Sequence, residues 1–546
     1  MTDRAADVLA KELYSAGCRY AFGMPGGEVL TLVDALERAG IRFILTKHEN
    51  AAGFMAEGIW QRTGAPGILV ATVGPGVANA INVIANAEQD RVPMLFLTGC
   101  VDEADALTYT HQVFDHQQLL RPITRASYRL TAEACDVVAV KAIRAATGER
   151  PGPVHVDVPI SVATAAAAPL GHTPPPVASP VGPVGQALEE AEAAIAAAER
   201  PLIIAGLEAL DNDGPACLAE LSDKLSAPIV TTYKAKGIVP EDRPYALGGA
   251  GLSPIADRLI LPLVAAADVI VAAGYDPIEM RTGWRQPWDP IRQTVIEITA
   301  HANDHDMHAA TMTFVGDVAA GLTALTPAAP LTDTWPDGAP ARTRAALADA
   351  FTLPNDPKSA TGDAPGWGPS AVIATARATC PPDTIATVDS GAHRILLSQM
   401  WQCSAPRTLL QSTGLCTMGC AIPLAAGAKL AEPERPVVAF TGDAGALMVL
   451  GELATLAELS LPVLVVVFVD RSLALIELKQ RQRQLKNAGV NFDHVDFAAV
   501  ADAMGGRGFT ARSSDELSAA LDTALSASTF SVIAAEIPRE AYDGLF

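Results

Sequence analysis

The chain has 546 residues, of which 49% are hydrophobic, 18% are charged and 5% are aromatic. A chain of this length exceeds one hydrophobic core, so about two to four domains are expected, and the scarcity of aromatic residues favours α/β layers over a β-sandwich. The net charge of -22 argues against nucleic acids and anionic membranes as partners, because both repel an acidic surface.

The N-terminal sequence and the cysteines bear on where the protein works. Residues 1–17 form an amphipathic pattern that contains acids, as a helix of a folded domain does and a signal peptide does not. No apolar run approaches the roughly 20 residues that span a bilayer. The eight cysteines are scattered without a CxxC pair, which is typical of buried free thiols in a reducing compartment. We therefore expect a cytoplasmic protein.

Two stretches rich in proline divide the chain into three blocks. Residues 164–185 are rich in Pro and Ala and cannot sustain a helix or a central strand, and a second break covers roughly residues 326–366. The predicted domains are residues 1–165, 186–328 and 366–546. In each block short apolar strands alternate with helical patterns, which predicts an α/β fold of three doubly wound parallel sheets. Ligands of such sheets bind at the carboxyl ends of the strands.

In the first block, polar segments follow predicted strands. Glu49 comes after the strand RFILT and opens a helical pattern, where the helix dipole alone is a sufficient reason for an acid. The tight turn at residues 74–76 (GPG) follows the strand GILVATV and precedes Asn79. His111 and Gln112 lie in the stretch THQVFDHQQLLRPITR, and the residues alone assign them no role.

The middle block contains three histidines in the sequence HANDHDMH. His301, His305 and His308 follow the strand TVIEIT, which raises the alternative of a transition-metal site. The segment lacks a cysteine, and neutral histidines are common in surface loops. We therefore favour the interpretation as a surface loop.

The third block carries acids at the ends of two predicted strands. Asp443 lies in the turn that follows the strand PVVAFT, and Asp470 ends the next strand, VLVVVFVD. Small residues around Asp443 let the backbone approach a phosphate at the helix start; they are Gly442, Ala444 and Gly445. A carboxylate there repels a phosphate unless a cation lies between them, and two carboxylates with diphosphate oxygens are usual ligands of Mg²⁺. For Asp470, a helix N-cap or turn residue is the alternative.

Two more segments of the third block place small residues in loops. The segment 389–393 (DSGAH) follows the strand TIATV. The segment 414–419 (GLCTMG) carries Met418, an unbranched apolar side chain for which a place in the core is the alternative.

Together these segments resemble the cofactor signature of thiamine diphosphate enzymes, which begins Gly-Asp-Gly and ends on Asn or Asp after a strand. Here the signature begins at residues 442–444 (GDA) and ends at residues 470–472 (DRS). Residues 469–509 are similar to catabolic acetolactate synthases, in which an Asp fills the second ligand position. The segments within residues 21–99 occur in the same order as in these synthases, whereas the middle block is loosely similar. The resemblance implies pyrimidine-binding, middle and diphosphate-binding domains in chain order.

The resemblance also implies ligands for Mg²⁺ and thiamine diphosphate. Asp443, Asp470 and the backbone carbonyl of Ser472 would bind the Mg²⁺ ion, and Met418 would lie under the cofactor and bend it into a V. The residues implied in cofactor binding are Gly74, Asn79, Gly391, Ala392, His393, Cys416, Met418, Gly442, Ala444 and Gly445. Flavin-containing relatives carry Gly-Ala-Arg-Phe-Asp-Asp in the middle domain, whereas this chain has AAGYDPIEMRTGW. FAD is therefore not expected.

Three residues receive catalytic roles from the resemblance. Glu49 would hydrogen-bond to nitrogen N1′ of the cofactor's pyrimidine ring and so promote proton removal from the thiazolium ring. His111 and Gln112 occupy the position of a Phe-Gln pair at the active site, and His111 implies a more polar substrate pocket. In the family this glutamate faces the diphosphate-binding domain of another subunit, so we expect a homodimer or homotetramer with active sites at the subunit interface.

The activity implied is decarboxylation of a 2-oxo acid followed by carboligation, in which the remaining fragment joins a second carbonyl compound, as in acetolactate synthases. The partners expected are therefore a small 2-oxo acid and a carbonyl acceptor. His111 keeps three more activities open: decarboxylation to an aldehyde, acetyl transfer to phosphate from a sulfonated aldehyde, and hydrolysis of a ring dione. A relative without catalytic activity is also conceivable, and Glu49, Met418 and the two aspartates argue against it.

Overall fold

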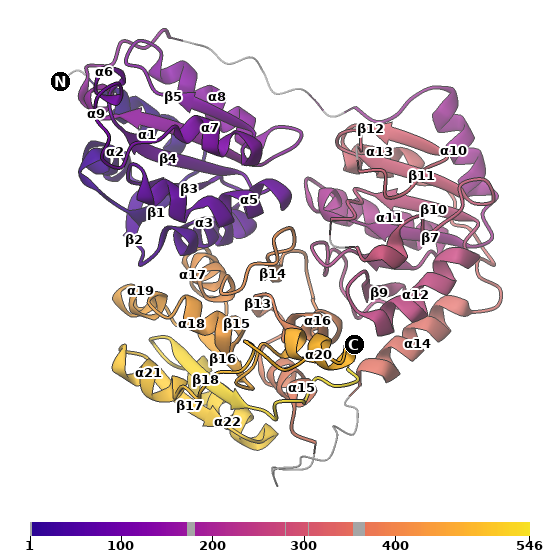
Figure 1. Ribbon diagram of the computed structural model, residues 1–546. Helices are drawn as coiled ribbons and strands as arrows, with labels where there is room; N and C mark the ends of the chain where they lie inside the picture. The colour runs from indigo at the N-terminus through magenta and orange to yellow at the C-terminus, as the bar shows by residue number, and fades with distance from the viewer. Residues whose placement is uncertain are drawn as a thin grey trace.

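The computed structural model describes residues 3–171, 179, 181–278, 280–303, 305–352 and 366–545. Within these residues the chain forms three sheets of six strands each, and every pair of neighbouring strands is parallel (Figure 1). Helices flank each sheet, so the predicted α/β fold of three doubly wound parallel sheets is confirmed.

The first domain is built on the sheet with strand order β2-β1-β3-β4-β6-β5. Its strands are β1 (Tyr20–Met24), β2 (Arg42–Leu45), β3 (Gly67–Ala71), β4 (Met94–Cys100), β5 (Ala126–Arg129) and β6 (Pro153–Pro159). Its helices are α1 (Ala5–Ser15), α2 (Leu30–Ala39), α3 (Glu49–Thr63), α4 (Pro75–Asn79), α5 (Ile81–Gln89), α6 (Glu103–Ala106), α7 (His116–Leu120), α8 (Cys135–Thr147) and α9 (Ile160–Thr164), with 3-10 turns η1 (Gly27–Val29) and η2 (Arg121–Ile123). The strands β3 and β4 are buried at every position, as the central strands of a doubly covered sheet should be.

The middle domain has the strand order β12-β11-β10-β7-β8-β9. Its strands are β7 (Pro201–Ala205), β8 (Ile229–Thr231), β9 (Ala246–Gly249), β10 (Val269–Ala273), β11 (Thr294–Thr299) and β12 (Met312–Val315). Its helices are α10 (Gln186–Ala196), α11 (Gly214–Leu225), α12 (Pro254–Ala266), α13 (Val318–Leu325) and α14 (Ala339–Phe351), with 3-10 turns η3 (Leu207–Leu210) and η4 (Thr282–Trp284). The helix α14 falls in the second predicted break and packs against α12.

The third domain has the strand order β14-β13-β15-β16-β18-β17. Its strands are β13 (Ile385–Val388), β14 (Leu409–Gln411), β15 (Val437–Gly442), β16 (Leu464–Val469), β17 (Arg507–Ala511) and β18 (Ser531–Glu536). Its helices are α15 (Pro369–Thr379), α16 (Ala392–Met400), α17 (Ala421–Ala431), α18 (Asp443–Met448), α19 (Glu452–Glu458), α20 (Ala474–Gln482), α21 (Phe497–Ala503) and α22 (Ser514–Leu525). Alternate residues of β15 enter two cores, Val437 and Ala439 on one face and Val438 and Phe440 on the other.

Near the centre of each sheet, two neighbouring strands are followed by connections that run in opposite directions, and this switch point is where open α/β sheets bind ligands. It lies between β1 and β3 in the first domain, between β7 and β10 in the middle domain, and between β13 and β15 in the third. The predicted breaks at residues 164–185 and 326–366 include positions 172–178 and 353–365, which lie outside the described ranges. The exact domain boundaries therefore stay a prediction.

The first and third domains pack together through α3 and α17, which lie side by side (Figure 1). A Cβ atom at Gly58 would overlap the carbonyl oxygen of Leu424, and one at Gly427 would overlap that of Met55. The two helix backbones are therefore as close as glycine allows, and residues of both domains share one hydrophobic core. This contact fixes the start of α3, with Glu49, relative to the third domain.

Candidate active site

The two predicted metal-binding carboxylates follow neighbouring strands of the third sheet. Asp443 begins α18 directly after β15, and Asp470 follows β16, which pairs with β15. Asp443 accepts hydrogen bonds from the N–H groups of Ala444 (2.8 Å) and Arg471 (2.7 Å), and Asp470 accepts one from the N–H of Ser472 (2.9 Å). Asp443 is 3% exposed and Asp470 is 8% exposed, so both carboxylates lie in a low-dielectric site.

The pKa values of Asp443 and Asp470 indicate that their negative charges are not balanced by a nearby cation within the ranges that the structure describes. Burial raises the pKa of Asp443, and burial together with the charge of Asp443 raises the pKa of Asp470 well above its usual range. The hydrogen bonds that these carboxylates accept from Ala444, Arg471 and Ser472 come from neutral backbone N–H groups. The hydroxyl oxygen of Ser472 is buried beside them without a hydrogen-bond partner among the described residues. Two hard oxygen ligands with unbalanced charge fit a divalent cation such as Mg²⁺.

Asp389 joins three segments of the third domain around these carboxylates. Its Oδ2 accepts hydrogen bonds from the N–H of Gly419 (2.6 Å) and the hydroxyl of Thr441 (3.1 Å), and its Oδ1 lies 2.9 Å from Nε2 of His393. A Cβ atom at Gly445 would overlap Oδ2 of Asp389, so the glycine in this turn is required by packing. Sequence reasoning assigned Asp389 no role, although it ends a strand as Asp443 and Asp470 do.

The segment with His393 lies against the same sheet edge. Gly391 and Ala392 lead into α16, and the His393 ring stacks on Phe468 with 5.2 Å between ring centroids. A Cβ atom placed at Gly442 would lie 3.4 Å from the His393 ring. His393 and the glycine turn are therefore neighbours at the switch point between β13 and β15. Ala444, at the position where the family signature has glycine, is half-buried and donates its N–H to Asp443.

The loop between β14 and α17 carries the predicted residues Cys416 and Met418. Cys416 has a left-handed backbone with φ of 50°, and its thiol donates to the carbonyl of Thr413 over 3.2 Å. The guanidinium of Arg394 contacts the same sulfur at 3.1 Å. Met418 is half-buried one residue before Gly419, which Asp389 holds. The loop is therefore attached to the edge that carries the two metal-binding candidates.

Glu49 begins α3 and is 4% exposed. Its Oε2 accepts a hydrogen bond from the side-chain amide of Asn79 (3.0 Å), and a Cβ atom at Gly76 would lie 3.2 Å from its Oε1. The structure thus brings together Glu49, Asn79 and the glycine turn that were predicted separately. Glu452 of the third domain accepts the N–H of Lys47 (2.9 Å), so a second domain fixes the turn that leads into Glu49.

Gly74 and Gln112 are in direct contact. Gly74 has a φ of 69°, and a Cβ atom there would overlap the carbonyl oxygen of Gln112, so only glycine fits. Gln112 itself has a left-handed backbone with φ of 60° and an exposed side chain. His111 is also exposed, and its ring lies 6.3 Å from that of Tyr109. Gln112 is therefore close to the glycine turn, and His111 lies at the surface of this chain.

A buried histidine that the sequence did not reveal holds this turn. The N–H of Gly74 donates to Nε2 of His116 (3.2 Å), and Nδ1 of His116 lies 2.8 Å from Asp157. Nε2 therefore carries the lone pair and Nδ1 the proton, which it donates to Asp157. His116, Asp157 and His155 form the group of potential metal ligands that is found within the described ranges. A protonated Nδ1 cannot ligate a metal, so we interpret the group as a hydrogen-bonding relay.

Known protein families match all three domains. Residues 3–119 match the family described as thiamine pyrophosphate enzyme, N-terminal TPP binding domain. Residues 188–325 match the central domain of thiamine pyrophosphate enzymes, and residues 389–535 match their C-terminal TPP binding domain. The acetolactate synthase isozyme 1 large subunit of Escherichia coli is 31% identical over 87% of this chain and 83% of that protein. The chain belongs to the thiamine pyrophosphate enzymes.

Two further relatives of this thiamine pyrophosphate enzyme differ in name. The catabolic acetolactate synthase of Raoultella terrigena is 29% identical over 97% of this chain and 94% of that protein. A probable 2-ketoarginine decarboxylase of Pseudomonas aeruginosa is 32% identical over 92% of this chain and 88% of that protein. The predicted family, enzymatic nature and cofactor, thiamine diphosphate, are confirmed by the family matches. The roles of the single residues stay predictions.

The three histidines of residues 301–308 have separate partners in this enzyme. His301 lies near Arg91 and Glu208, at 3.2 Å from each, and His308 bonds to Glu297 at 2.9 Å. In His305, Nδ1 accepts the N–H of Met307. They do not form a metal-ligand group within the described part of the chain, and the His308 side chain is 2% exposed, so the segment is less exposed than the expected surface loop. In the same described ranges, no helix combines the length and apolar composition needed to cross a bilayer.

Proposed function

We propose that this thiamine pyrophosphate enzyme decarboxylates a 2-oxo acid and joins the remaining fragment to a second carbonyl compound, with pyruvate as the simplest donor. The observation that carries the proposal is the pair Asp443 and Asp470, two buried carboxylates of raised pKa beside a glycine turn at the switch point. Such a pair supports binding of Mg²⁺ and a diphosphate. The similarity to two acetolactate synthases over most of the chain favours carboligation as the outcome.

For cofactor binding, we propose that different segments at the edge of the third sheet contact the metal ion and the diphosphate. Asp443, Asp470 and Ser472 would hold Mg²⁺, and the turn of Gly442, Ala444 and Gly445 lets the backbone approach the diphosphate. Gly391, Ala392 and His393 approach the same edge from α16. When bound, thiamine diphosphate supplies a nucleophilic carbon and an electron sink for cleavage of the carbon–carbon bond.

Glu49 is the proposed proton-handling residue. Because Asn79 donates to Oε2, the carboxylate has a fixed orientation and its Oε1 lies toward the glycine turn that Gly74 begins. A buried carboxylate in a fixed orientation can share a proton with a ring nitrogen. Gln112, which contacts Gly74, and His111 would face the substrate, and Met418 would support the cofactor from below.

The proposed assembly is a homodimer or homotetramer with active sites between subunits. Leu45 and Met448 are 48% and 64% exposed, and they lie on the segments that meet where Glu452 binds the N–H of Lys47. Exposed apolar side chains this near a candidate active site favour cover by a second copy. Light scattering after size-exclusion chromatography measures the state, and a monomer with full activity would contradict this part. The free cysteines, which are mostly buried, support the proposed cytoplasmic location.

One experiment tests the activity directly. Purified enzyme with thiamine diphosphate and Mg²⁺ is screened for carbon dioxide release over a set of 2-oxo acids, and the products are analysed for ketols. We expect release from pyruvate or a related acid together with a 2-hydroxy-3-oxo acid or ketol. Release with aldehyde as the product would favour simple decarboxylation, for which the similarity to a 2-ketoarginine decarboxylase is a reason. Formation of an acyl phosphate would instead identify acetyl transfer, and cleavage of a ring dione would identify hydrolysis.

Glu49→Gln tests the proton-handling role. We expect the rate of carbon dioxide release to fall by about 10²- to 10⁴-fold, because the amide cannot share a proton in the same way. Glu458→Gln is the matched control, since Glu458 is an exposed acid that contacts the neighbouring Lys47. Equal rates in the two variants would show that Glu49 does not handle the proton.

A further inference from the structure

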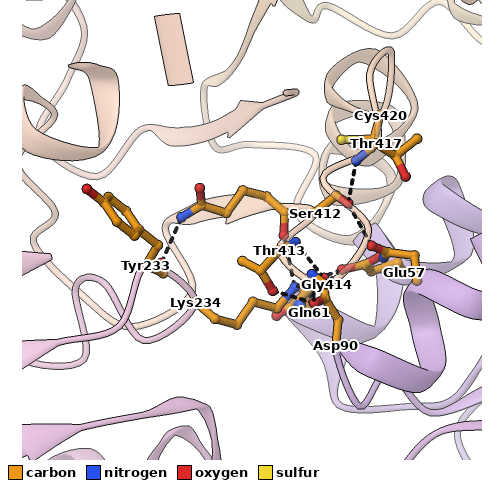
Figure 2. Close-up of polar contacts among 12 residues, drawn as sticks. Glu57, Gln61, Asp90, Tyr233, Lys234, Ser412, Thr413, Gly414, Thr417 and Cys420 are labelled. Carbon is orange, nitrogen blue, oxygen red and sulfur yellow. Dashed lines mark hydrogen bonds and ion pairs between the residues drawn. The ribbon is translucent and has the colours of Figure 1, made fainter. Parts of the chain in front are cut away.

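The loop that carries Cys416 and Met418 is held by a side chain from another domain. Asp90 of the first domain contacts this loop, and Lys234 of the middle domain contacts Asp90, so all three domains meet here (Figure 2). We propose that Asp90, balanced by Lys234, is a positioning residue that fixes the loop in the conformation that supports the cofactor. This inference rests on the proposed function for the role of Met418.

Asp90 accepts several hydrogen bonds from the start of the loop. Its carboxylate accepts the N–H of Thr413 (3.0 Å), the N–H of Gly414 (2.7 Å) and the hydroxyl of Thr413. Its side chain is 0% exposed, so these bonds do not compete with water. Two backbone N–H groups on one carboxylate fix the path of the chain as well as its position. The loop therefore starts from a point that the first domain defines.

Lys234 supplies the charge that Asp90 requires. Its ammonium donates to Asp90 (2.9 Å), to Glu57 (3.3 Å) and to the carbonyl of Gln411 (2.9 Å), the residue where β14 ends. Burial alone would raise the pKa of Asp90, but the charge of Lys234 and the hydrogen bonds from Thr413 outweigh it and lower this pKa. Burial raises the pKa of Glu57, the second carboxyl that contacts Lys234.

The helix α5 adds two more contacts along the same face. Asn82, Asn86 and Asp90 are spaced four residues apart, which places them on one side of a helix. Asn86 accepts the hydroxyl of Ser412 (2.6 Å), and Asn82 accepts that of Thr417 (2.9 Å). The first domain thus contacts the loop at its start and next to Met418. At the far end of the loop, Asp389 of the third domain holds the N–H of Gly419.

The position of Met418 therefore depends on contacts with the first domain as well as on contacts within its own domain. If Asp90 is removed, the loop keeps its contacts with Asn82, Asn86 and Asp389, but Thr413 and Gly414 lose the carboxylate that fixes them. The cofactor would then have to order the loop on binding, which weakens its affinity. Because the contacts of Asp90 are formed in the protein alone, their loss can be measured without any substrate.

The test uses a variant that removes both charges, Asp90→Asn with Lys234→Met, because removing one alone would leave a buried charge without a partner. Burial raises the pKa of Glu57, and loss of Lys234 removes a charge that lowers it, so the substitution favours the neutral form of this carboxyl. The matched control is Glu241→Gln with Lys236→Met, a second buried pair of the middle domain, at 2.6 Å, that contacts the third domain at Cys403. The control removes the same charges and an equivalent domain contact, but does not touch the loop.

Hydrogen–deuterium exchange of the cofactor-free proteins and calorimetric titration with thiamine diphosphate in Mg²⁺ give two readouts. We expect exchange of the amides at residues 412–418 to become at least about 10-fold faster in the first variant, and the cofactor to bind at least about 10-fold more weakly. The control should match the wild type in both. Unchanged exchange and affinity in the first variant would overturn the proposal, and so would equal changes in both variants. If the wild type does not bind the cofactor, the proposed function fails, while exchange still reports on the contacts of Asp90.

Discussion

The middle and third domains treat the same kind of sheet edge in opposite ways. In both, acids follow strands at the switch point of a six-stranded parallel sheet. In the third domain, burial raises the pKa of Asp443, and burial together with the charge of Asp443 raises the pKa of Asp470, so this pair favours a bound cation. In the middle domain, Glu208 follows β7 and Asp276 follows β10, and Arg91 of the first domain binds both, at 2.5 Å from Asp276. One edge is balanced by the protein itself and the other is not.

Charge balance, more than the fold, therefore distinguishes the candidate ligand site of the third domain from the interdomain contact of the middle domain. Arg91 is buried, and its guanidinium contacts Glu208 and Asp276 at the kind of sheet edge where open α/β sheets bind ligands. The absence of FAD stays a prediction from the sequence.

Arg91→Met tests the balanced edge and should have the largest effect on stability. It leaves Glu208 and Asp276 buried without their cation, so we expect the free energy of unfolding to fall by about 3–5 kcal/mol. Chemical denaturation monitored by fluorescence measures the change. Arg150→Met is the control, because Arg150 pairs with Glu88 at a partly exposed site and such a pair contributes about 0–1 kcal/mol. Equal stability of the two variants would remove the contrast between the edges.

Asp470→Asn tests the unbalanced edge and should act in the opposite direction on stability. Without metal, the free energy of unfolding should rise by about 1–3 kcal/mol, because a buried charge has been removed. In Mg²⁺, affinity for thiamine diphosphate should fall at least about 100-fold, since a proposed metal ligand is lost. Thermal unfolding with EDTA and calorimetric titration measure the two effects. A variant that is less stable than the wild type in EDTA would show that Asp470 is already balanced.

The pH dependence of the metal-free protein is the smallest expected effect. The pKa values of Asp443 and Asp470 are raised in the folded state, whereas in the unfolded state they have the usual value of about 4. Between the usual and the raised pKa values, the folded state therefore binds more protons than the unfolded state. Stability should therefore fall as pH rises through this window. Thermal unfolding in EDTA should show a steeper fall for the wild type than for Asp470→Asn. Mg²⁺ with thiamine diphosphate should flatten the wild-type curve, and parallel curves in EDTA would contradict the assignment.

Much of this site could be predicted because it follows a local rule. Asp443 and Asp470 end apolar strands, and the carboxyl ends of neighbouring parallel strands meet at one edge whatever the rest of the chain does. The strands themselves are readable as apolar runs between turns, so the α/β fold followed from the same pattern. The contact between Asn79 and Glu49 was not predicted, because a helix, a strand and a turn separate the two residues in sequence.

The interdomain contacts could not be predicted in this way. Lys234 binds Asp90 across 144 positions, and Arg91 binds Asp276 across 185. Nothing in the local pattern of a charged residue says which distant strand end it will reach. His116 lies only five residues after His111, which the sequence did single out. Its hydrogen bond with Gly74 could not be predicted, because it depends on how the 42 positions that separate Gly74 from His116 fold. Such contacts are found only from the packed structure, because no local sequence pattern identifies the distant partner.

Asp90 and Arg91 are adjacent residues of opposite charge, and both bind residues of other domains. Asp90 binds Lys234 and the loop of the third domain, while Arg91, with a left-handed backbone of φ 55°, binds the acids of the middle domain. This arrangement has a consequence for recombining domains among related enzymes. In a chimera that exchanges the middle domain alone, the incoming domain must contain both a cation that pairs with Asp90 and two acids that pair with Arg91. Exchange boundaries drawn only at the linkers will preserve each sheet and still separate these charges from their partners.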